Sequence, residues 1–115
     1  MTLDPNAMSR LLEITGGDVA FVDELVDTFL DDATVQLDGL RAAGAATDAE
    51  AIVRPAHSLK SNSDNVGATV LADLCRSLEA DGRAGHVPEM AERIVAIESE
   101  FAAVRAALLE NRSTR

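Results

Sequence analysis

The chain contains two histidines, and the residues around them differ in what they permit. His86 stands beside Gly85 in a stretch with turn composition, and we interpret it as a solvated loop residue. His57 falls in a segment with helical periodicity, whose inner side is marked at steps of three and four by Ile52, Ala56, Leu59 and Ser63. At about 100° per residue, His57 lies about 140° from Ile52 and should expose its imidazole.

Three polar residues share the helix surface with His57. Lys60, Ser61 and Asp64 follow it by three, four and seven positions, which brings them within reach of its ring. An exposed imidazole is a nucleophile for an activated phosphorus atom, an ammonium one turn away can hold phosphoryl oxygens, and a small serine leaves room for a partner. The pattern predicts phosphoryl chemistry at His57 assisted by Lys60. An exposed His beside a Lys is also compatible with an ordinary solvated surface.

Motifs for other phosphate or metal chemistry are missing from the sequence. Neither a G-x-x-x-x-G-K-[ST] nor a G-x-G-x-x-G loop is present, so no ATP site is expected. Metal-dependent bundle oxidases use Glu-x-x-His pairs on facing helices, and neither histidine has a Glu three residues before it. We therefore expect no resident cofactor, no metal ligands and no complete enzyme active site.

Five helical segments should position this surface, and the first two have clear boundaries. The first follows Pro5, which suits a first helical turn, and stops at Gly16-Gly17. Asp18 caps a long second helix, which the small residues around Gly44 end.

The other three helices begin and end at similar signals. Thr47-Asp48-Ala49-Glu50 has the form of a capping box and opens the third helix, which Gly67 is placed to end. A turn over 81–85 closes the fourth helix, and the last begins near Pro88. Residues 111–115 are expected to form a flexible tail.

Apolar residues at helical steps define the expected core. One side of the first helix carries Met8, Leu11, Leu12 and Ile14. The four longer segments have the stripes Val22, Val26, Phe29, Ala33, Leu37 and Leu40; Ile52, Ala56, Leu59, Ser63 and Val66; Leu71, Leu74, Cys75 and Leu78; and Met90, Ile94, Ile97, Phe101, Val104 and Leu108. Phe21 and Leu25 widen the stripe of the second helix, which should therefore bury two faces. Because short links join antiparallel neighbours, residues 1–115 should form one all-α domain, an antiparallel up-and-down four-helix bundle with a short extra N-terminal helix.

Pro55 breaks the pattern of the third helix two residues before His57. Inside a helix, proline removes one backbone hydrogen bond and crowds the carbonyl four residues back. The helix should therefore either kink at Pro55 or restart near it, and the sequence leaves both alternatives open.

Composition and charge exclude several classes of function. With 47% apolar and 3% aromatic residues, a helical core is favoured over a β-sandwich. The net charge of −10 repels polyanions such as nucleic acids. No stretch approaches the ~18 apolar residues of a membrane span, and no signal-peptide pattern is present. A single cysteine, Cys75, suits a reducing compartment, so we expect a cytoplasmic protein. We also expect a monomer that binds neither nucleic acid nor membrane.

The segment around His57 resembles the signature of histidine-containing phosphotransfer (HPt) domains of two-component phosphorelays. Residues 56–68 read A-H-S-L-K-S-N-S-D-N-V-G-A, where the family pattern is roughly A-H-x-L-K-[GS]-x-[SA]-x-x-[LIV]-G-A. Residues 21–32 and 74–79 are similar to the family's second and fourth helices, so the resemblance covers nearly the whole chain. Ser61 replaces the glycine of many members, and Pro55 before the Ala-His pair is less usual.

The resemblance implies a role for each matching residue. His57 would be the phosphorylated nucleophile, Lys60 the cation that contacts the phosphoryl group, and Gly67 the end of the helix. Ser61 would be the small residue over which the partner's active site closes. The residues expected at the docking face are Arg54, Ser61 and Asp64.

A mechanism and partners also follow from the resemblance. Nε2 of His57 would attack the aspartyl phosphate of a receiver domain, and a second receiver aspartate would later take the phosphoryl group. Partners would be receiver domains of response regulators or hybrid histidine kinases, with Mg²⁺ on the receiver. An initiating Met1 and a complete bundle favour a free-standing protein. The alternative is a helical adaptor that binds a signalling partner through the same face without phosphorylation, and the presence of His57 with Lys60 argues against it.

Overall fold

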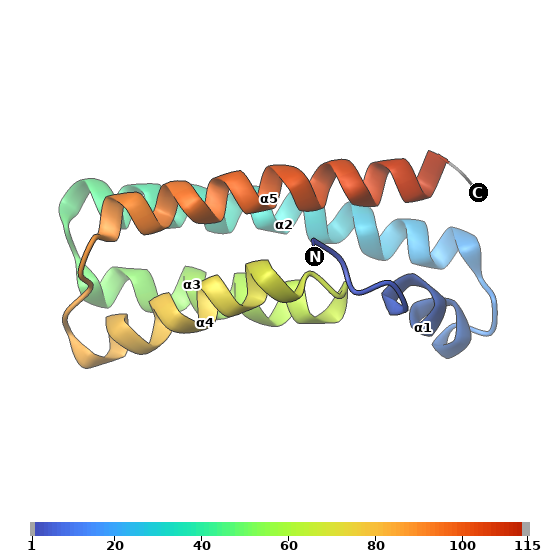
Figure 1. Cartoon of the computed structure of the whole chain (residues 1–115), viewed down its shortest axis with the longest axis horizontal. Coiled ribbons are helices and arrows are strands. Elements are labelled where there is room, and N and C mark those ends of the chain that lie inside the picture. The colour runs from blue at the N-terminus through green and yellow to red at the C-terminus, as the bar shows by residue number, and fades with distance from the viewer. Residues whose placement is uncertain (1, 114–115) are drawn as a thin grey trace.

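Four long antiparallel helices and one short helix make up the fold. The computed structural model describes residues 2–113, with 111–113 described by their backbone alone. The helices are α1 (Ala7–Ile14), α2 (Val19–Ala46), α3 (Ala49–Asn65), α4 (Thr69–Ala84) and α5 (Met90–Ser113), and no strand occurs within these residues. Figure 1 shows α2 to α5 running in alternating directions along the long axis, with α1 at one end of the bundle. The predicted all-α architecture is confirmed.

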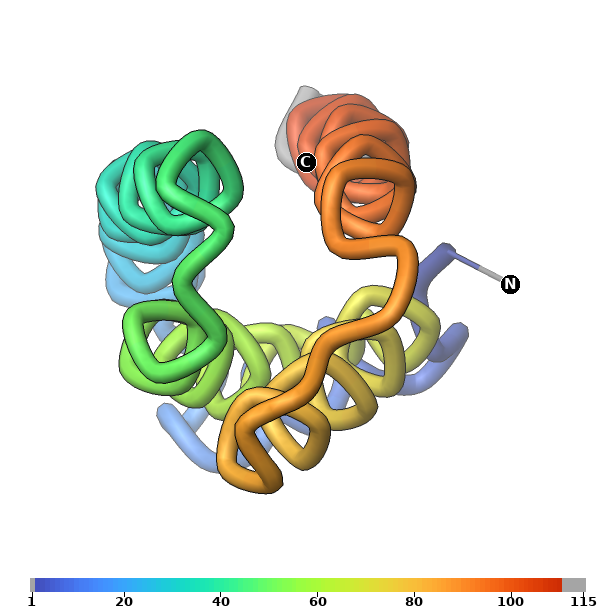
Figure 2. The backbone as a smooth tube through the Cα atoms, turned by 90° about the vertical axis from the view of Figure 1, so that its left-hand side faces the viewer, coloured from blue at the N-terminus to red at the C-terminus, as the bar shows by residue number. Residues whose placement is uncertain are grey.

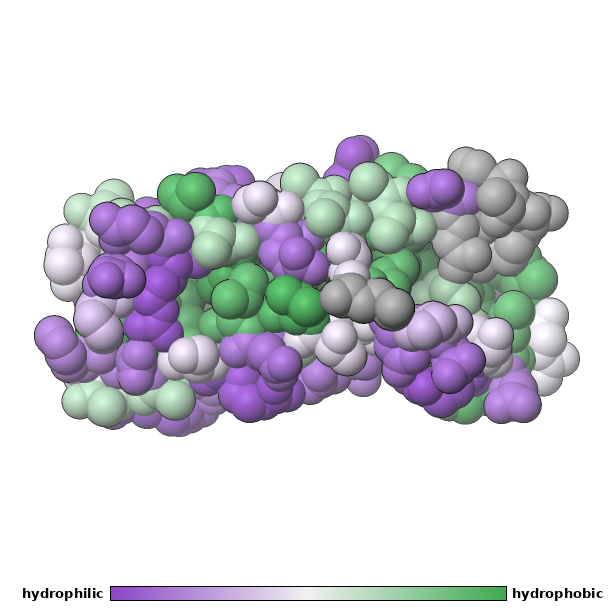
Figure 3. All heavy atoms as spheres, in the orientation of Figure 1, coloured by the Kyte–Doolittle hydropathy of each residue, from purple (hydrophilic) through white to green (hydrophobic). Residues whose placement is uncertain are grey.

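The core lies between the four long helices, which stand at the corners of the end-on view in Figure 2. Every residue of the stripes predicted for α2, α3 and α5 is buried. In α4, Leu74 is only half-buried and packs against the core, while the rest of its stripe is buried. Apolar side chains also appear along the seam between α5 and α4 in the space-filling view of Figure 3. Helical periodicity was therefore sufficient to identify the core of the bundle.

The predicted second buried face of α2 is wrong, and the predicted apolar side of α1 is only partly buried. Phe21 is 45% exposed and Leu25 is half-buried, so α2 does not bury a second face there. In α1, Met8, Leu11 and Leu12 are half-buried, with Met8 packed against the core, whereas Ile14 is 81% exposed. The cause is that α1 covers one end of the bundle rather than its length, so a second apolar face has little to pack against.

The link between α2 and α3 lies one residue later than the sequence suggested. Asp48 is the N-cap of α3, because its side chain accepts a hydrogen bond from the Ala51 backbone N–H at 3.1 Å. Thr47 instead has φ +50° and ends α2, so the predicted capping box is wrong. The cap of α2 by Asp18, which accepts from the Phe21 N–H at 3.0 Å, is confirmed.

Two glycine-containing segments predicted to be turns are helical. α2 continues through Gly44, where a Cβ atom would lie 2.8 Å from Cδ1 of Ile94 in α5. α4 continues through residues 81–84, with Gly85 as its C-cap. A Cβ atom at Gly82 would lie 3.0 Å from the carbonyl oxygen of Ala49 in α3. Both glycines permit close contact between helices, so the predicted ends of α2 and α4 are wrong.

The last helix begins two residues after the proline expected to open it. Pro88 and Glu89 form a turn in which Glu89 has φ +54°, and α5 starts at Met90. α5 continues to Ser113, so the backbone of 111–113 is helical. Residues 114 and 115 of the predicted tail lie outside the described residues. Within residues 2–113, no helix has the length and apolar character needed to span a membrane.

α3 is continuous through Pro55, so the alternative in which the helix restarts there is excluded. The proline ring is buried against α2, where Gly39 makes room for it: a Cβ atom at Gly39 would lie 3.3 Å from Cβ of Pro55. The close packing of Pro55 fixes α3 against α2 two residues before His57.

The C-terminal end of α3 is held by the N-terminal segment. α3 ends at Asn65, and Gly67 follows with φ +77° and donates its N–H to the carbonyl oxygen of Asp64. The N–H of Asp4 donates to the Gly67 carbonyl oxygen at 2.7 Å. A Cβ atom at Gly67 would lie only 2.2 Å from Cβ of Ala7. Glycine is therefore required both by the backbone conformation and by the contact with α1.

Candidate functional site

His57 lies on the surface of α3, on the side that faces away from the core. Its side chain is 53% exposed, whereas the four residues used to define the inner side of the helix are fully buried. The predicted exposure of the imidazole is confirmed. His86, which was interpreted as a loop residue, is exposed just after α4.

The ring of His57 is held by a carboxylate from the neighbouring helix. Glu79 of α4 has a side chain only 9% exposed, and its Oε2 atom lies 3.0 Å from Nδ1 of His57. The other oxygen, Oε1, is 2.9 Å from Nζ of Lys60. Arg83, one turn further along α4, donates to Oε2 from Nε at 3.0 Å and from a terminal nitrogen at 2.7 Å. One buried carboxylate thus contacts three side chains with N–H groups.

The charges around Glu79 keep it ionised. Its burial raises the pKa, but hydrogen bonds from Lys60, Arg83 and His57, together with the charge of Lys60, outweigh this effect and lower the pKa from 4.5 to about 2. An ionised carboxylate can only accept hydrogen bonds, so the proton between Glu79 and His57 belongs to Nδ1. In a neutral imidazole, Nε2 then carries the lone pair and is the nucleophilic atom.

Lys60 lies within the site, in contact with Glu79. Its side chain is 21% exposed, and its ammonium is paired with Oε1 of Glu79. The sequence placed Lys60 beside His57 through their shared helix, and the structure adds that both contact the same carboxylate. Its contact with a phosphoryl group stays a prediction.

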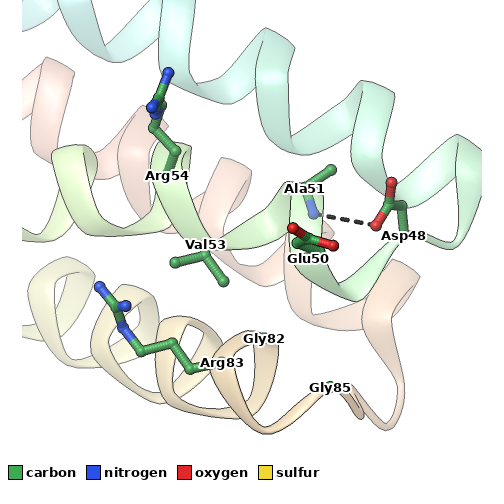
Figure 4. A pocket seen from close by; sticks show the side chains of 8 residues that line it. All are labelled: Asp48, Glu50, Ala51, Val53, Arg54, Gly82, Arg83 and Gly85. Atoms are coloured by element: carbon green, nitrogen blue, oxygen red, sulfur yellow. Dashed lines mark hydrogen bonds between the residues drawn. The ribbon is translucent and has the colours of Figure 1, made fainter.

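The residues predicted to dock a partner surround His57 on the α3 surface. Ser61 is half-buried and lies one turn after His57. Asp64 is exposed and pairs with Arg76 of α4 at 3.1 Å. Arg54 is exposed one turn before His57 and lines an open groove between α3 and α4, together with Arg83 (Figure 4). All three lie within two helical turns of His57 on α3, and their role in docking stays a prediction.

Sequence reasoning missed Glu79, the residue with the most contacts to the site. Glu79 belongs to a different helix and is separated from His57 by 22 positions, so the spacing of residues on one helix surface could not reveal it. One signal was present: Glu79 directly follows the buried Leu78, at the edge of the apolar stripe of α4. A carboxylate at such a position needs partners when it is buried.

Within residues 2–113, no group of three or more His, Cys, Asp or Glu side chains is arranged to hold a metal ion.

Comparison with known proteins identifies the family of this bundle. The family model of the Hpt domain matches residues 24–107, which include α3, α4 and all four side chains of the site. The chain belongs to the Hpt domain family. A search of curated proteins gave no match.

A solved structure of an Hpt protein has the same architecture. The crystal structure of histidine-containing phosphotransfer protein B (HptB) from Pseudomonas aeruginosa PAO1 superposes with a TM-score of 0.89 and 35% sequence identity. The match covers 99% of this chain and 96% of that one. Together, the family and the structural match support a histidine phosphotransfer role in phosphorelays for this Hpt chain.

Proposed function

We propose that this Hpt protein carries a phosphoryl group on Nε2 of His57 between receiver-domain aspartates. The observation that carries the proposal is the hydrogen bond between Nδ1 of His57 and the buried carboxylate of Glu79. It fixes the ring and its tautomer, and it leaves Nε2 as the nucleophile on an exposed part of α3. Membership of the Hpt domain family and the structural similarity to HptB support a role in a phosphorelay.

Lys60 is proposed to neutralise charge on the phosphoryl group. Phosphoryl transfer depends on in-line alignment and on neutralising the equatorial oxygens more than on covalent help from the protein. Lys60 already lies beside the ring through their common contact with Glu79, so a small movement of its flexible side chain would bring the ammonium to a group on His57. This supports the role that the sequence motif implied.

The protein is proposed to act as a stoichiometric carrier rather than as a complete enzyme. The chain has no glycine-rich phosphate-binding loop for ATP, and the Mg²⁺ and acidic cluster of the reaction would be supplied by the receiver domain. Arg54, Ser61 and Asp64 are proposed to contact that receiver around His57. We also propose that the protein works in the cytoplasm, as the single buried Cys75 suits.

Transfer of label tests the proposal. Purified receiver domains of the source organism, phosphorylated with a labelled phosphoryl group, are mixed with the parent protein, with His57→Gln and with the matched control His86→Gln. The parent and His86→Gln should take label that is labile in acid and comparatively stable in base, and His57→Gln should take none. Label on His57→Gln would refute the site.

The rival function is a helical adaptor that binds its partner without phosphorylation. It predicts that at least one receiver binds the parent tightly while no label appears on the protein. Binding of each receiver measured in the same samples therefore separates the two functions.

A further inference from the structure

Phosphorylation changes the charge of the His57 ring, and the transfer reaction determines which ring nitrogen carries the proton. When the Nε2 lone pair forms a bond to phosphorus, the bond between phosphorus and the aspartate oxygen breaks, and its electron pair returns to the aspartate carboxylate. The proton on Nδ1 takes no part in this exchange. The product is therefore an imidazolium that carries the phosphoryl group on Nε2 and a proton on Nδ1.

The Nδ1 proton determines how easily the phosphoryl group leaves. If the proton stays, the ring departs as neutral imidazole when the next aspartate attacks phosphorus. If the proton is lost to solvent, the ring must depart as imidazolate, which is a far stronger base and a poorer leaving group. Retention of a single proton on the phosphorylated ring thus decides whether the carrier can pass its cargo on.

The structure places a carboxylate at this proton. Oε2 of Glu79 lies 3.0 Å from Nδ1, its side chain is 9% exposed, and it is attached to a different helix from the ring. A negative charge at this distance in a partly desolvated position stabilises the protonated form of the ring.

Other charged groups near this contact come from α3, α4 and α2. Lys60 of α3 and Arg83 of α4 contact Glu79 itself. The Arg76–Asp64 ion pair joins α4 to α3 one turn further on. On the α2 side, Asp32 accepts a hydrogen bond from the amide of Asn62. Among these charged groups, Glu79 is the one observed in contact with Nδ1 of the His57 ring.

We propose that Glu79 is a positioning residue that retains the Nδ1 proton of phosphorylated His57 and thereby keeps the phosphoryl group transferable in neutral and mildly alkaline solution. The inference rests on the proposed function, because it requires a phosphoryl group on Nε2. It adds a role for a residue that does not touch the phosphorus atom. Lys60 and Arg83 each have two opposing effects on the Nδ1 proton. They keep Glu79 ionised, which favours retention of the proton, and their positive charges disfavour a cationic ring.

Two substitutions separate this role from simple structural support. Glu79→Gln keeps the size of the side chain and an oxygen that can accept from Nδ1, but removes the negative charge. Arg83→Gln leaves the carboxylate and removes a cation from the same oxygen atom. If charge at Nδ1 governs transfer, Glu79→Gln should shift the pH dependence of transfer to lower pH, and Arg83→Gln should not.

The experiment follows onward transfer from phosphorylated His57 to one receiver between pH ~6 and pH ~10. Loss of label from the Hpt chain is measured, because the receiver aspartyl phosphate hydrolyses in base. We expect the pH at which the rate falls to half to be lower by about 1 unit in Glu79→Gln, so that transfer above both midpoints is about tenfold slower. In Arg83→Gln the midpoint should equal that of the parent or be higher. Nitrogen-15 NMR of the phosphorylated proteins should show the Nδ1 proton persisting to higher pH in the parent than in Glu79→Gln.

Each failure has a distinct signature. If no receiver labels the parent, the proposed function fails. If the parent is labelled but Glu79→Gln has the same midpoint and the same loss of the Nδ1 proton, the function stands and the role of Glu79 is refuted. If circular dichroism shows that Glu79→Gln is unfolded, the parent decides the question: an unprotonated Nδ1 in phosphorylated His57 at pH ~7.5 overturns the inference.

Discussion

Glu79→Gln should change how the stability of the bundle depends on pH. In the folded protein, burial raises the pKa of Glu79 but hydrogen bonds from Lys60, Arg83 and His57 outweigh it, so the pKa lies near 2 instead of 4.5. A lowered pKa stabilises the folded state only while the carboxyl group is ionised. This stabilisation is therefore complete above pH ~4.5 and is lost as the pH falls towards ~2.

The size of the effect follows from the shift and from the exposure of the partners. A change from 4.5 to about 2 corresponds to about 3 kcal/mol. The His57 and Arg83 side chains are 53% and 60% exposed, so solvent screens part of their contribution. We therefore expect that between about 1 and 2 kcal/mol of the free energy of unfolding depends on the ionisation of Glu79.

Urea denaturation followed by far-ultraviolet circular dichroism measures this quantity, since the chain has no Trp or Tyr to report by fluorescence. The parent and Glu79→Gln are compared at pH ~6 and pH ~2.5. Both lose stability in acid because other carboxylates are protonated. The parent should lose about 1 to 2 kcal/mol more than the variant. Equal losses in the two proteins would refute the electrostatic description of the site.

Substitutions at three further positions test the cation, the docking surface and the end of α3. Lys60→Ala should slow phosphotransfer by roughly ten- to a hundredfold without abolishing it, because the ammonium stabilises charge while the imidazole attacks. Ser61→Leu should change the free energy of unfolding by no more than about 0.5 kcal/mol, but slow transfer at least about tenfold by displacing the receiver, while Ser61→Gly should transfer like the parent. Gly67→Ala should lower the free energy of unfolding by about 2 to 4 kcal/mol, because its Cβ atom would lie 2.2 Å from that of Ala7 at φ +77°.

Time courses with one labelled receiver and urea titrations of the same preparations check all three. Transfer by Lys60→Ala at the parental rate would remove the cation from the mechanism. Normal transfer by Ser61→Leu would mean that the receiver docks elsewhere, and a large loss of stability would mean that Ser61 is a packing residue. A Gly67→Ala protein as stable as the parent would contradict the described contact between α1 and the end of α3.

Helical periodicity predicted the bundle because burial depends on which side of a helix a residue occupies. The inner stripes of α2, α3 and α5 could all be identified, and the same angular argument correctly exposed His57. The boundaries were predicted less well where glycine had two possible uses. Gly44 and Gly82 have the composition of turns, but in the structure they allow helices to approach closely.

The α2–α3 link shows a second reason why helix boundaries could not be predicted from the sequence. Thr47 and Asp48 are both good helix caps, and the two possible registers differ by one residue. Only the tertiary structure determines that Thr47 adopts a left-handed conformation to close the short link, which leaves the cap to Asp48. No glycine at this position signalled the left-handed conformation in advance.

Half of the candidate site was predictable from the sequence and half depended on tertiary packing. His57 and Lys60 are three residues apart on one helix, so helix geometry alone brings them together. Glu79 and Arg83 come from α4, and their contact with that pair depends on how α3 and α4 pack. The family resemblance supplied a role for the α3 residues, whereas the role of Glu79 follows from its burial and its contacts.

The most direct test of the proposed mechanism is to identify the atom of His57 that carries phosphorus. Protein with nitrogen-15 in its histidine rings is phosphorylated by a receiver, and coupling between phosphorus-31 and nitrogen-15 identifies the bonded nitrogen. Because Glu79 occupies Nδ1, we expect phosphorus to be coupled to Nε2 of His57. Coupling to Nδ1, or phosphorus on any other residue, would contradict it.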